Sequence, residues 1–200
     1  MVLSKRTRHL HDVAASLRRD GVAIFPCDTM LGLVGRLTPE VFRRINVLKQ
    51  RQPDSPYLVL VPTATWVPRL ATAISAEELQ FMDMYWPGPN TLLLNRNPDV
   101  DPSLFPGSDK IALRWPAYHA LNHLLALVKE PLFSTSVNFS GNTPAKRYED
   151  IPWSIEKEVD FVFEADKIPA GSESALVRFR QGQLDILRGA LTEMPRGVTY

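Results

Sequence analysis

Short β-rich apolar runs alternate with amphipathic helical stripes along the chain, and this alternation limits the fold more than any other sequence feature. Apolar residues keep helical spacing over 10–17, and the run 22–25 follows Gly21, a residue typical of helix ends. Thr38-Pro39-Glu40 supplies an N-cap, a first-turn proline and a first-turn acid, which predicts a helix ending near Lys49. Helix and strand therefore alternate from the start of the chain.

The alternation continues to residue 188. Ser75 to Glu78 has the spacing of a capping box and predicts a helix to about Tyr85, and an apolar stripe predicts another helix over 118–129. Further expected strands are 58–61, 91–94, 111–114, 132–137 and a hairpin of 175–180 with 184–188 around Gly182. Because strands and helices do not segregate, and no repeat or linker divides them, we expect one α/β domain over 1–200 with a mixed sheet.

Composition excludes several protein classes. Hydrophobic residues at 44% and charged residues at 22% are ordinary for globular proteins, which excludes a disordered or collagen-like chain. Basic and acidic residues nearly balance at 23 against 22, so a polyanion must be bound locally rather than by a global field. With one cysteine, no secretory-type start and no apolar run near the ~20 residues of a membrane helix, we expect a reduced, cytoplasmic protein that spans no membrane.

Two cations leave the predicted second helix together. Lys49 and Arg51 stand two residues apart before Pro53, and in an extended segment they would project to one side. An ammonium beside a planar guanidinium suits phosphate or carboxylate oxygens. The alternative is a solvated helix end whose cations favour the helix dipole.

A ladder of small polar side chains ends the strand at 132–137. Ser134, Ser136 and Asn138 share one face by period two, and Ser140 and Gly141 follow. These groups can hydrogen-bond a ligand, or they can mark a strand end that turns into a loop. Three cations border apolar strands in a similar way, namely Lys110, Arg114 and Arg188. Each can clamp an anion or form a surface ion pair.

Other common chemistries find little support. Neither a G-x-x-x-x-G-K-[ST] nor a G-x-G-x-x-G stretch is present. His119 and His123 have a spacing that suits a metal, but no third ligand lies nearby in the sequence, so we expect no metal site. Cys27 follows a proline without a cation or histidine beside it, which indicates a buried small hydrophobe rather than a nucleophile.

Taken in order, these segments resemble the YrdC-like family, the threonylcarbamoyl-AMP synthases, in its single-domain form. The family pattern runs P-T-[DE]-T-x-[YF]-G-L, K-x-R, W-P-G-P-x-T, R-x-P, S-T-S-A-N-x-S-G, a serine-bearing strand and a final Arg-Gly or Arg-x-Gly. The corresponding stretches here are Pro26-Cys27-Asp28-Thr29-Met30-Leu31-Gly32-Leu33, Lys49-Gln50-Arg51, Trp86-Pro87-Gly88-Pro89-Asn90-Thr91, Arg114-Trp115-Pro116, Ser134 to Gly141, Ser174 and Arg188-Gly189. Their shared order covers residues 8 to 190, nearly the whole chain.

The resemblance implies a twisted mixed sheet with flanking helices around a deep basic cavity. It implies a nucleotidyltransferase that joins L-threonine, bicarbonate and ATP into threonylcarbamoyl-AMP and pyrophosphate, with Mg²⁺ accompanying the triphosphate. The product would feed a tRNA modification, so tRNA and modification proteins are further expected partners.

The resemblance also assigns roles to single residues. Lys49, Arg51, Ser136 and Asn138 would form the catalytic tetrad around the reacting phosphate and carbamate, and Arg188 would reach the nucleotide. Threonine would be held by Thr29, Arg114, Ser134 and Ser174.

This sequence departs from the family pattern at four positions. Cys27 replaces a threonine, Leu31 an aromatic residue, Ser55 a lysine and Ala175 a threonine. These departures keep two alternatives open: a non-catalytic RNA-binding or ribosome-associated module, and a paralogue that adenylylates another carbamoyl substrate.

Overall fold

The protein is described by a computed structural model that covers residues 5–52, 57–166, 168–169 and 173–192. The α-helices are α1 (Leu10–Leu17), α2 (Pro39–Lys49), α3 (Val67–Leu70), α4 (Ala76–Tyr85), α5 (His119–Val128) and α6 (Trp153–Glu156). Short 3₁₀ turns are η1 (Ala64–Trp66), η2 (Pro102–Leu104) and η3 (Tyr148–Asp150). In this part of the chain no helix is long and apolar enough to cross a membrane.

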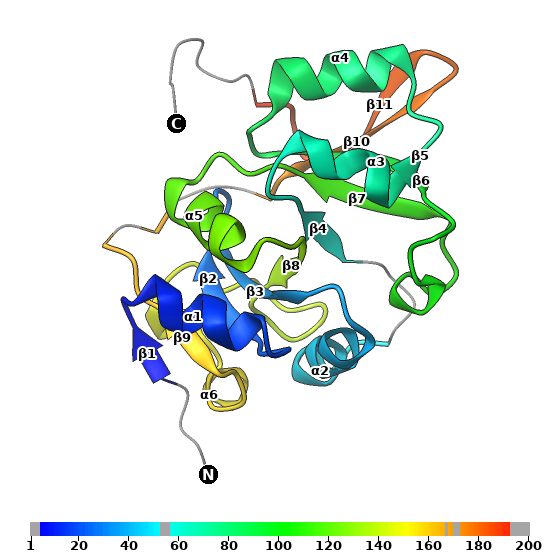
Figure 1. Cartoon of the computed structure of the whole chain (residues 1–200). Coiled ribbons are helices and arrows are strands. Elements are labelled where there is room, and N and C mark those ends of the chain that lie inside the picture. Colours follow the sequence, from blue (N-terminus) through cyan, green and yellow to red (C-terminus); the bar gives the residue numbers. More distant parts are fainter. Residues whose placement is uncertain (1–4, 53–56, 167, 170–172, 193–200) are drawn as a thin grey trace.

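The strands form one mixed sheet with the order β1-β9-β2-β3-β8-β4-β7-β6-β10-β11, and β5 pairs with β6. They are β1 (Lys5–Thr7), β2 (Ala23–Pro26), β3 (Leu31–Arg36), β4 (Leu58–Leu60), β5 (Ala71–Thr72), β6 (Asn90–Arg96), β7 (Lys110–Arg114), β8 (Leu132–Ser136), β9 (Phe161–Phe163), β10 (Ala175–Arg180) and β11 (Gln183–Arg188). The expected mixed α/β sheet with flanking helices is confirmed (Figure 1).

Side-chain alternation along β3 and β8 divides the core into two apolar clusters. In one cluster, α1 and α5 lie side by side and pack on Val34 and Leu132 (Figure 1). In the other, α2 packs on Leu33 and Phe133, the neighbouring strand positions. Because successive strand residues point to opposite faces, these helices cover opposite sides of the sheet.

Local signals set several element ends where the sequence predicts them. Thr38 accepts a hydrogen bond from Val41 N at 3.4 Å, and α2 begins at Pro39. Ser75 and Glu78 form both bonds of the capping box at the start of α4. The predicted hairpin also forms, with Gln181 and Gly182 at positive φ in the turn between β10 and β11.

Several short elements were not predicted from the sequence. β3 was missed because Gly32 and Gly35 interrupt its apolar run, and glycine is depleted in strands. β1 and β9 hold three residues each and were missed because they are too short to show a period. β3 and β9 pair with both sides of β2 and so complete the half of the sheet behind α1.

Candidate functional site

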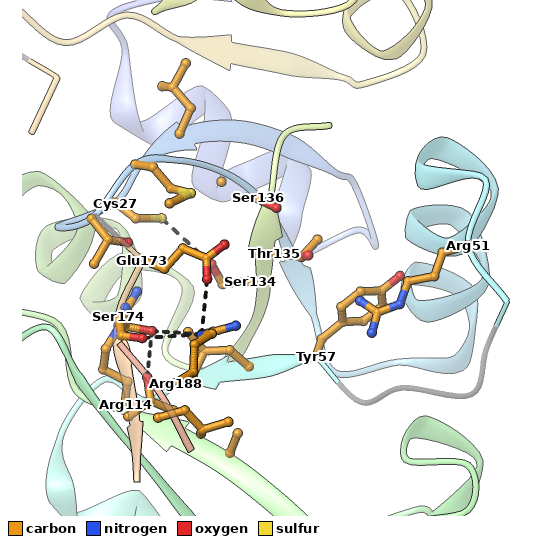
Figure 2. A pocket seen from close by; sticks show the side chains of 18 residues that line it. Cys27, Arg51, Tyr57, Arg114, Ser134, Thr135, Ser136, Glu173, Ser174 and Arg188 are labelled. Atoms are coloured by element: carbon orange, nitrogen blue, oxygen red, sulfur yellow. Dashed lines mark hydrogen bonds and ion pairs between the residues drawn. The ribbon is translucent and has the colours of Figure 1, made fainter. Parts of the chain in front are cut away.

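A half-open cavity with a volume of about 200 Å³ lies over the middle of the sheet. Seven of the nine residues singled out by the resemblance line it: Thr29, Arg51, Arg114, Ser134, Ser136, Ser174 and Arg188. Arg51 lies at one end beside Tyr57, whereas Arg114, Ser174 and Arg188 gather at the other (Figure 2). Segments separated by more than a hundred residues therefore share one hollow.

Strand register explains the floor of the cavity. Ser134 on β8 pairs directly with Leu58 on β4, and Leu58 pairs with Ala112 on β7. Directly paired residues place their side chains on the same face of a sheet, so these three side chains form one row. Ser134 and Ala112 have small side chains, and all three residues of the row line the cavity.

Arg114 ends β7 and is buried, with 1% of its surface exposed. Its Nη2 lies 3.1 Å from Oδ1 of Asp28, whose side chain is 8% exposed. Within the described chain, Arg114 Nε and Asp28 Oδ1 nevertheless have no hydrogen-bond partner. Buried polar groups are normally paired, so the Nε donor of Arg114 indicates a site that an acceptor on a ligand completes.

Cys27 and Ser134 form the wall next to this pair. Cys27 Sγ lies 3.8 Å from Ser134 Oγ, and the side chain is buried, which confirms the expected small hydrophobe. Burial raises the pKa of the Cys27 thiol to about 11, so the group is neutral at physiological pH. A Cβ on Gly32 would lie 2.9 Å from Cys27 Sγ and 3.3 Å from Ser134 Oγ, so the wall closes tightly only because residue 32 is glycine.

Arg188 at the end of β11 approaches the cavity from the hairpin. Its Nε lies 3.3 Å from Glu173 Oε2, and its Nη2 donates to Ser174 Oγ at 3.4 Å. Thr91 donates to the same Ser174 oxygen at 3.1 Å. Figure 2 shows the Glu173 carboxylate over the cavity between Ser134 and Arg188. Arg188 is half exposed, so its charge is available to a ligand at the mouth.

Arg51 is held at the opposite end by an aromatic ring. Its guanidinium lies 5.0 Å from the centroid of Tyr57, a cation–π distance. Tyr57 Oη donates to Asn46 Oδ1 at 2.7 Å, which fixes the ring against α2. Burial raises the pKa of Tyr57 to about 12, and Arg51 lowers it by a smaller amount. The phenol is therefore a neutral platform for the cation.

Lys49 and Asn138 do not line the cavity, and both are buried. Lys49 Nζ donates to Ser136 O, Asn138 O and Asn138 Oδ1 at 2.6, 3.1 and 2.8 Å. Burial, and then repulsion from Arg51, lowers the pKa of Lys49 to about 8. The two predicted segments therefore meet, as the resemblance implies, but Lys49 contacts the polar ladder from behind.

The expectation that Lys49 and Arg51 project to one side was wrong. It assumed an extended segment, but Lys49 is the last residue of α2 and Gln50 adopts the left-handed conformation with φ of 50°. This turn sends Lys49 inward and Arg51 to the cavity. The solvated helix end is also excluded at Lys49, which is only 3% exposed.

Other candidates from the sequence lie elsewhere. Lys110 donates to Asn95 and pairs with Asp109, away from the cavity lining. The His119 and His123 rings lie 6.4 Å apart, and among the described residues no group of three or more His, Cys, Asp or Glu side chains could hold a metal ion. Ser55 lies outside the described residues.

Sequence reasoning missed several cavity residues, among them Glu173, Tyr57 and Thr91. Asp28 stands inside the first motif but received no role. Glu173 could have been suspected only because it directly precedes Ser174 in the sequence. Thr91 ends the W-P-G-P-x-T motif but received no role, and no motif marks Tyr57.

Comparisons with known proteins agree with this architecture. A curated threonylcarbamoyl-AMP synthase from Pyrococcus abyssi is 26% identical over 88% of this chain and 52% of its own length. One from Idiomarina loihiensis is 26% identical over 83% of this chain and 91% of its own. The chain thus spans about half the length of the Pyrococcus relative and most of the Idiomarina relative.

Solved structures show the same fold. P. abyssi Sua5 in complex with L-threonine superposes with a TM-score of 0.82, at 24% identity, over 94% of this chain and 57% of that one. Escherichia coli YciO gives a TM-score of 0.76 at 17% identity, with 94% of each chain covered. The model of the Sua5/YciO/YrdC family, described as "Telomere recombination", matches residues 15–190. With its mixed sheet, its shared cavity and this match over most of its length, the chain belongs to the Sua5/YciO/YrdC family.

Proposed function

We propose that this chain is a threonylcarbamoyl-AMP synthase, which forms threonylcarbamoyl-AMP and pyrophosphate from L-threonine, bicarbonate and ATP. One observation carries the proposal: Arg51, Ser136, Arg114, Ser174 and Arg188 come from distant segments and line a single cavity. The names of the curated relatives support the same reaction.

The end of the cavity near Arg114 is the proposed amino-acid site. The unpartnered Nε of Arg114 can donate to the threonine carboxylate, and Thr29 and Ser174 supply neutral hydroxyls beside it. Ser134 completes the polar wall. The complex of P. abyssi Sua5 with L-threonine is consistent with such a site in this fold.

The nucleotide then occupies the open part of the cavity. Arg51 and Arg188 stand at its two ends and can attract phosphate oxygens, while Ser136 lies on the wall between them. Lys49 and Asn138 support Ser136 from below. Glu173 is ion-paired with Arg188, and Asp28 with Arg114. Mg²⁺ would therefore arrive with ATP, held chiefly by the triphosphate, as is usual for this ion.

Charge development explains why fixed cations are needed. The threonine amine forms a C–N bond with the bicarbonate carbon, and water leaves, which gives a carbamate. A carbamate oxygen then bonds to the α-phosphorus as the bond to the bridging oxygen of pyrophosphate breaks. Negative charge gathers at the phosphate during this step, where preorganised cations stabilise it. We assign this role to Arg51 and Arg188, which line the cavity.

Release of pyrophosphate tests the proposal against its alternatives. Purified protein is mixed with ATP, Mg²⁺ and bicarbonate, with and without L-threonine. Threonine-dependent release supports the synthase. Release without threonine would indicate another carbamoyl substrate, and no release would favour a non-catalytic module. Adding unmodified tRNA and the proteins that consume the product then tests the proposed place in tRNA modification.

A further inference from the structure

The ammonium group of Lys49 has no free donor. A lysine ammonium carries three protons, and Lys49 Nζ has three acceptors: Ser136 O, Asn138 O and Asn138 Oδ1. All three lie within 3.1 Å. A phosphate oxygen could accept a hydrogen bond from this group only if one of these three bonds were broken first.

Both ends of Lys49 hold the same loop, residues 136–142. Its backbone carbonyl accepts from Ser140 N at 2.9 Å. Inside the loop, Ser136 Oγ donates to Asn138 Oδ1 at 2.6 Å, and Asn138 Nδ2 donates to Asn142 O at 2.6 Å. Asn138 Oδ1 is thus the shared acceptor that joins the lysine to the serine. Lys49 therefore contacts this loop through both its ammonium group and its backbone carbonyl.

Arg51 differs from Lys49 in each of these respects. It lines the cavity and lies over the Tyr57 ring, and among the described residues its side chain forms no comparable network. A guanidinium presents five donors in a planar fork, so it can bind phosphate while it stays stacked on the ring. The two cations of the motif therefore have different partners and different access to a ligand.

We propose that Lys49 is a positioning residue that orders the 136–142 loop and acts on the nucleotide through Ser136, whereas Arg51 makes the direct ionic contact with phosphate. This inference rests on the proposed function for the identity of the ligand. The arrangement of the loop around Lys49 is a property of the free protein, so the two can fail separately.

Amide hydrogen exchange in the free protein gives the first test. In Lys49→Met, the amides of residues 137–142 should exchange faster by about tenfold to a hundredfold, the factor that corresponds to loss of a hydrogen bond to a charged group. Arg51→Met is the matched control, because it removes the neighbouring cation without touching the loop contacts. Exchange that is unchanged in Lys49→Met, or equally fast in both variants, would overturn the proposal.

Wild-type protein supplies a second test that does not depend on a variant that folds. When ATP is added, the side-chain nitrogen signal of Arg51 should shift in NMR spectra, and that of Lys49 should shift much less. A Lys49 signal that moves as far as that of Arg51 would establish direct contact and overturn the inference. If wild-type protein does not bind ATP, the proposed function fails, and the exchange experiment still decides the role of Lys49.

Affinity measurements separate the two roles where the variants fold. Lys49→Met and Asn138→Ala should weaken ATP binding by similar factors, and the double variant should be no weaker than the worse single one, because the two residues form one unit. Lys49→Met combined with Arg51→Met should show nearly multiplied losses. Multiplied losses in the first pair would contradict the proposal.

Discussion

Gly32 provides a sharp test of where the amino acid binds. A methyl group at this position would lie 2.9 Å from Cys27 Sγ and 3.3 Å from Ser134 Oγ, both on the cavity wall. The shorter contact is well inside the ~3.5–4.0 Å of relaxed nonbonded atoms. Overpacking of this kind costs about 1–3 kcal/mol. Cys27 and Ser134 would relieve the clash by moving into the cavity, and a bound threonine would have to push them back, so Gly32→Ala should weaken threonine binding by up to about 150-fold.

A second substitution should reverse the effect. Cys27→Ala removes the sulfur that the new methyl group meets, so Gly32→Ala combined with Cys27→Ala should recover most of the threonine affinity measured by calorimetry. Gly35→Ala is the control, because its Cβ would meet Val41 Cγ1 at 2.5 Å in the core rather than in the cavity. It should lower the free energy of unfolding and leave threonine affinity unchanged in the folded fraction. Normal affinity in Gly32→Ala would refute this location of the amino-acid site.

Three further predictions concern charges near the cavity. Arg114→Met should lower the free energy of unfolding by about 3–5 kcal/mol in urea titrations, because Asp28 stays buried without its cation. Adding Asp28→Asn should recover part of the loss, and no recovery would contradict the pairing. Glu173→Gln should tighten ATP binding about two- to fivefold by freeing Arg188, and weaker binding would mean that the carboxylate helps to bind the nucleotide. Burial raises the pKa of Cys27 from 9.0 to about 11, so the thiol of the unfolded chain loses its proton at lower pH than the folded one. The unfolding free energy of wild type should therefore fall relative to that of Cys27→Ala as pH rises from 9 to 11, and parallel pH curves would contradict this.

Elements with local signals could be predicted from the sequence. Thr38 and Ser75 cap the first turns of α2 and α4 through bonds that span only three residues. The start of each helix can therefore be predicted from neighbouring residues in the sequence. The turn at Gly182 is local in the same sense. β3 could not be predicted in this way. Its two glycines avoid clashes with Cys27 and Val41, and these contacts exist only in the folded protein.

The candidate site could be predicted only where family motifs mark it. Arg114 and Ser174 belong to such motifs, and so do their partners Asp28 and Thr91. That Arg114 pairs with Asp28 and Ser174 with Thr91 follows only from the tertiary fold. The role of Lys49 shows the same limit. Its spacing from Arg51 indicates two equivalent cations, and the left-handed turn between them gives the two different surroundings.

The origin of the carbon in the product distinguishes threonylcarbamoyl-AMP synthesis from any other use of ATP by this protein. The protein is incubated with ATP, Mg²⁺, L-threonine and ¹³C-labelled bicarbonate, and the reaction is analysed by mass spectrometry. A threonylcarbamoyl-AMP synthase should form one adduct that contains threonine, the labelled carbon and AMP, in equal amount to pyrophosphate. Pyrophosphate without a labelled adduct, or an adduct that forms equally well without threonine, would contradict the proposed function.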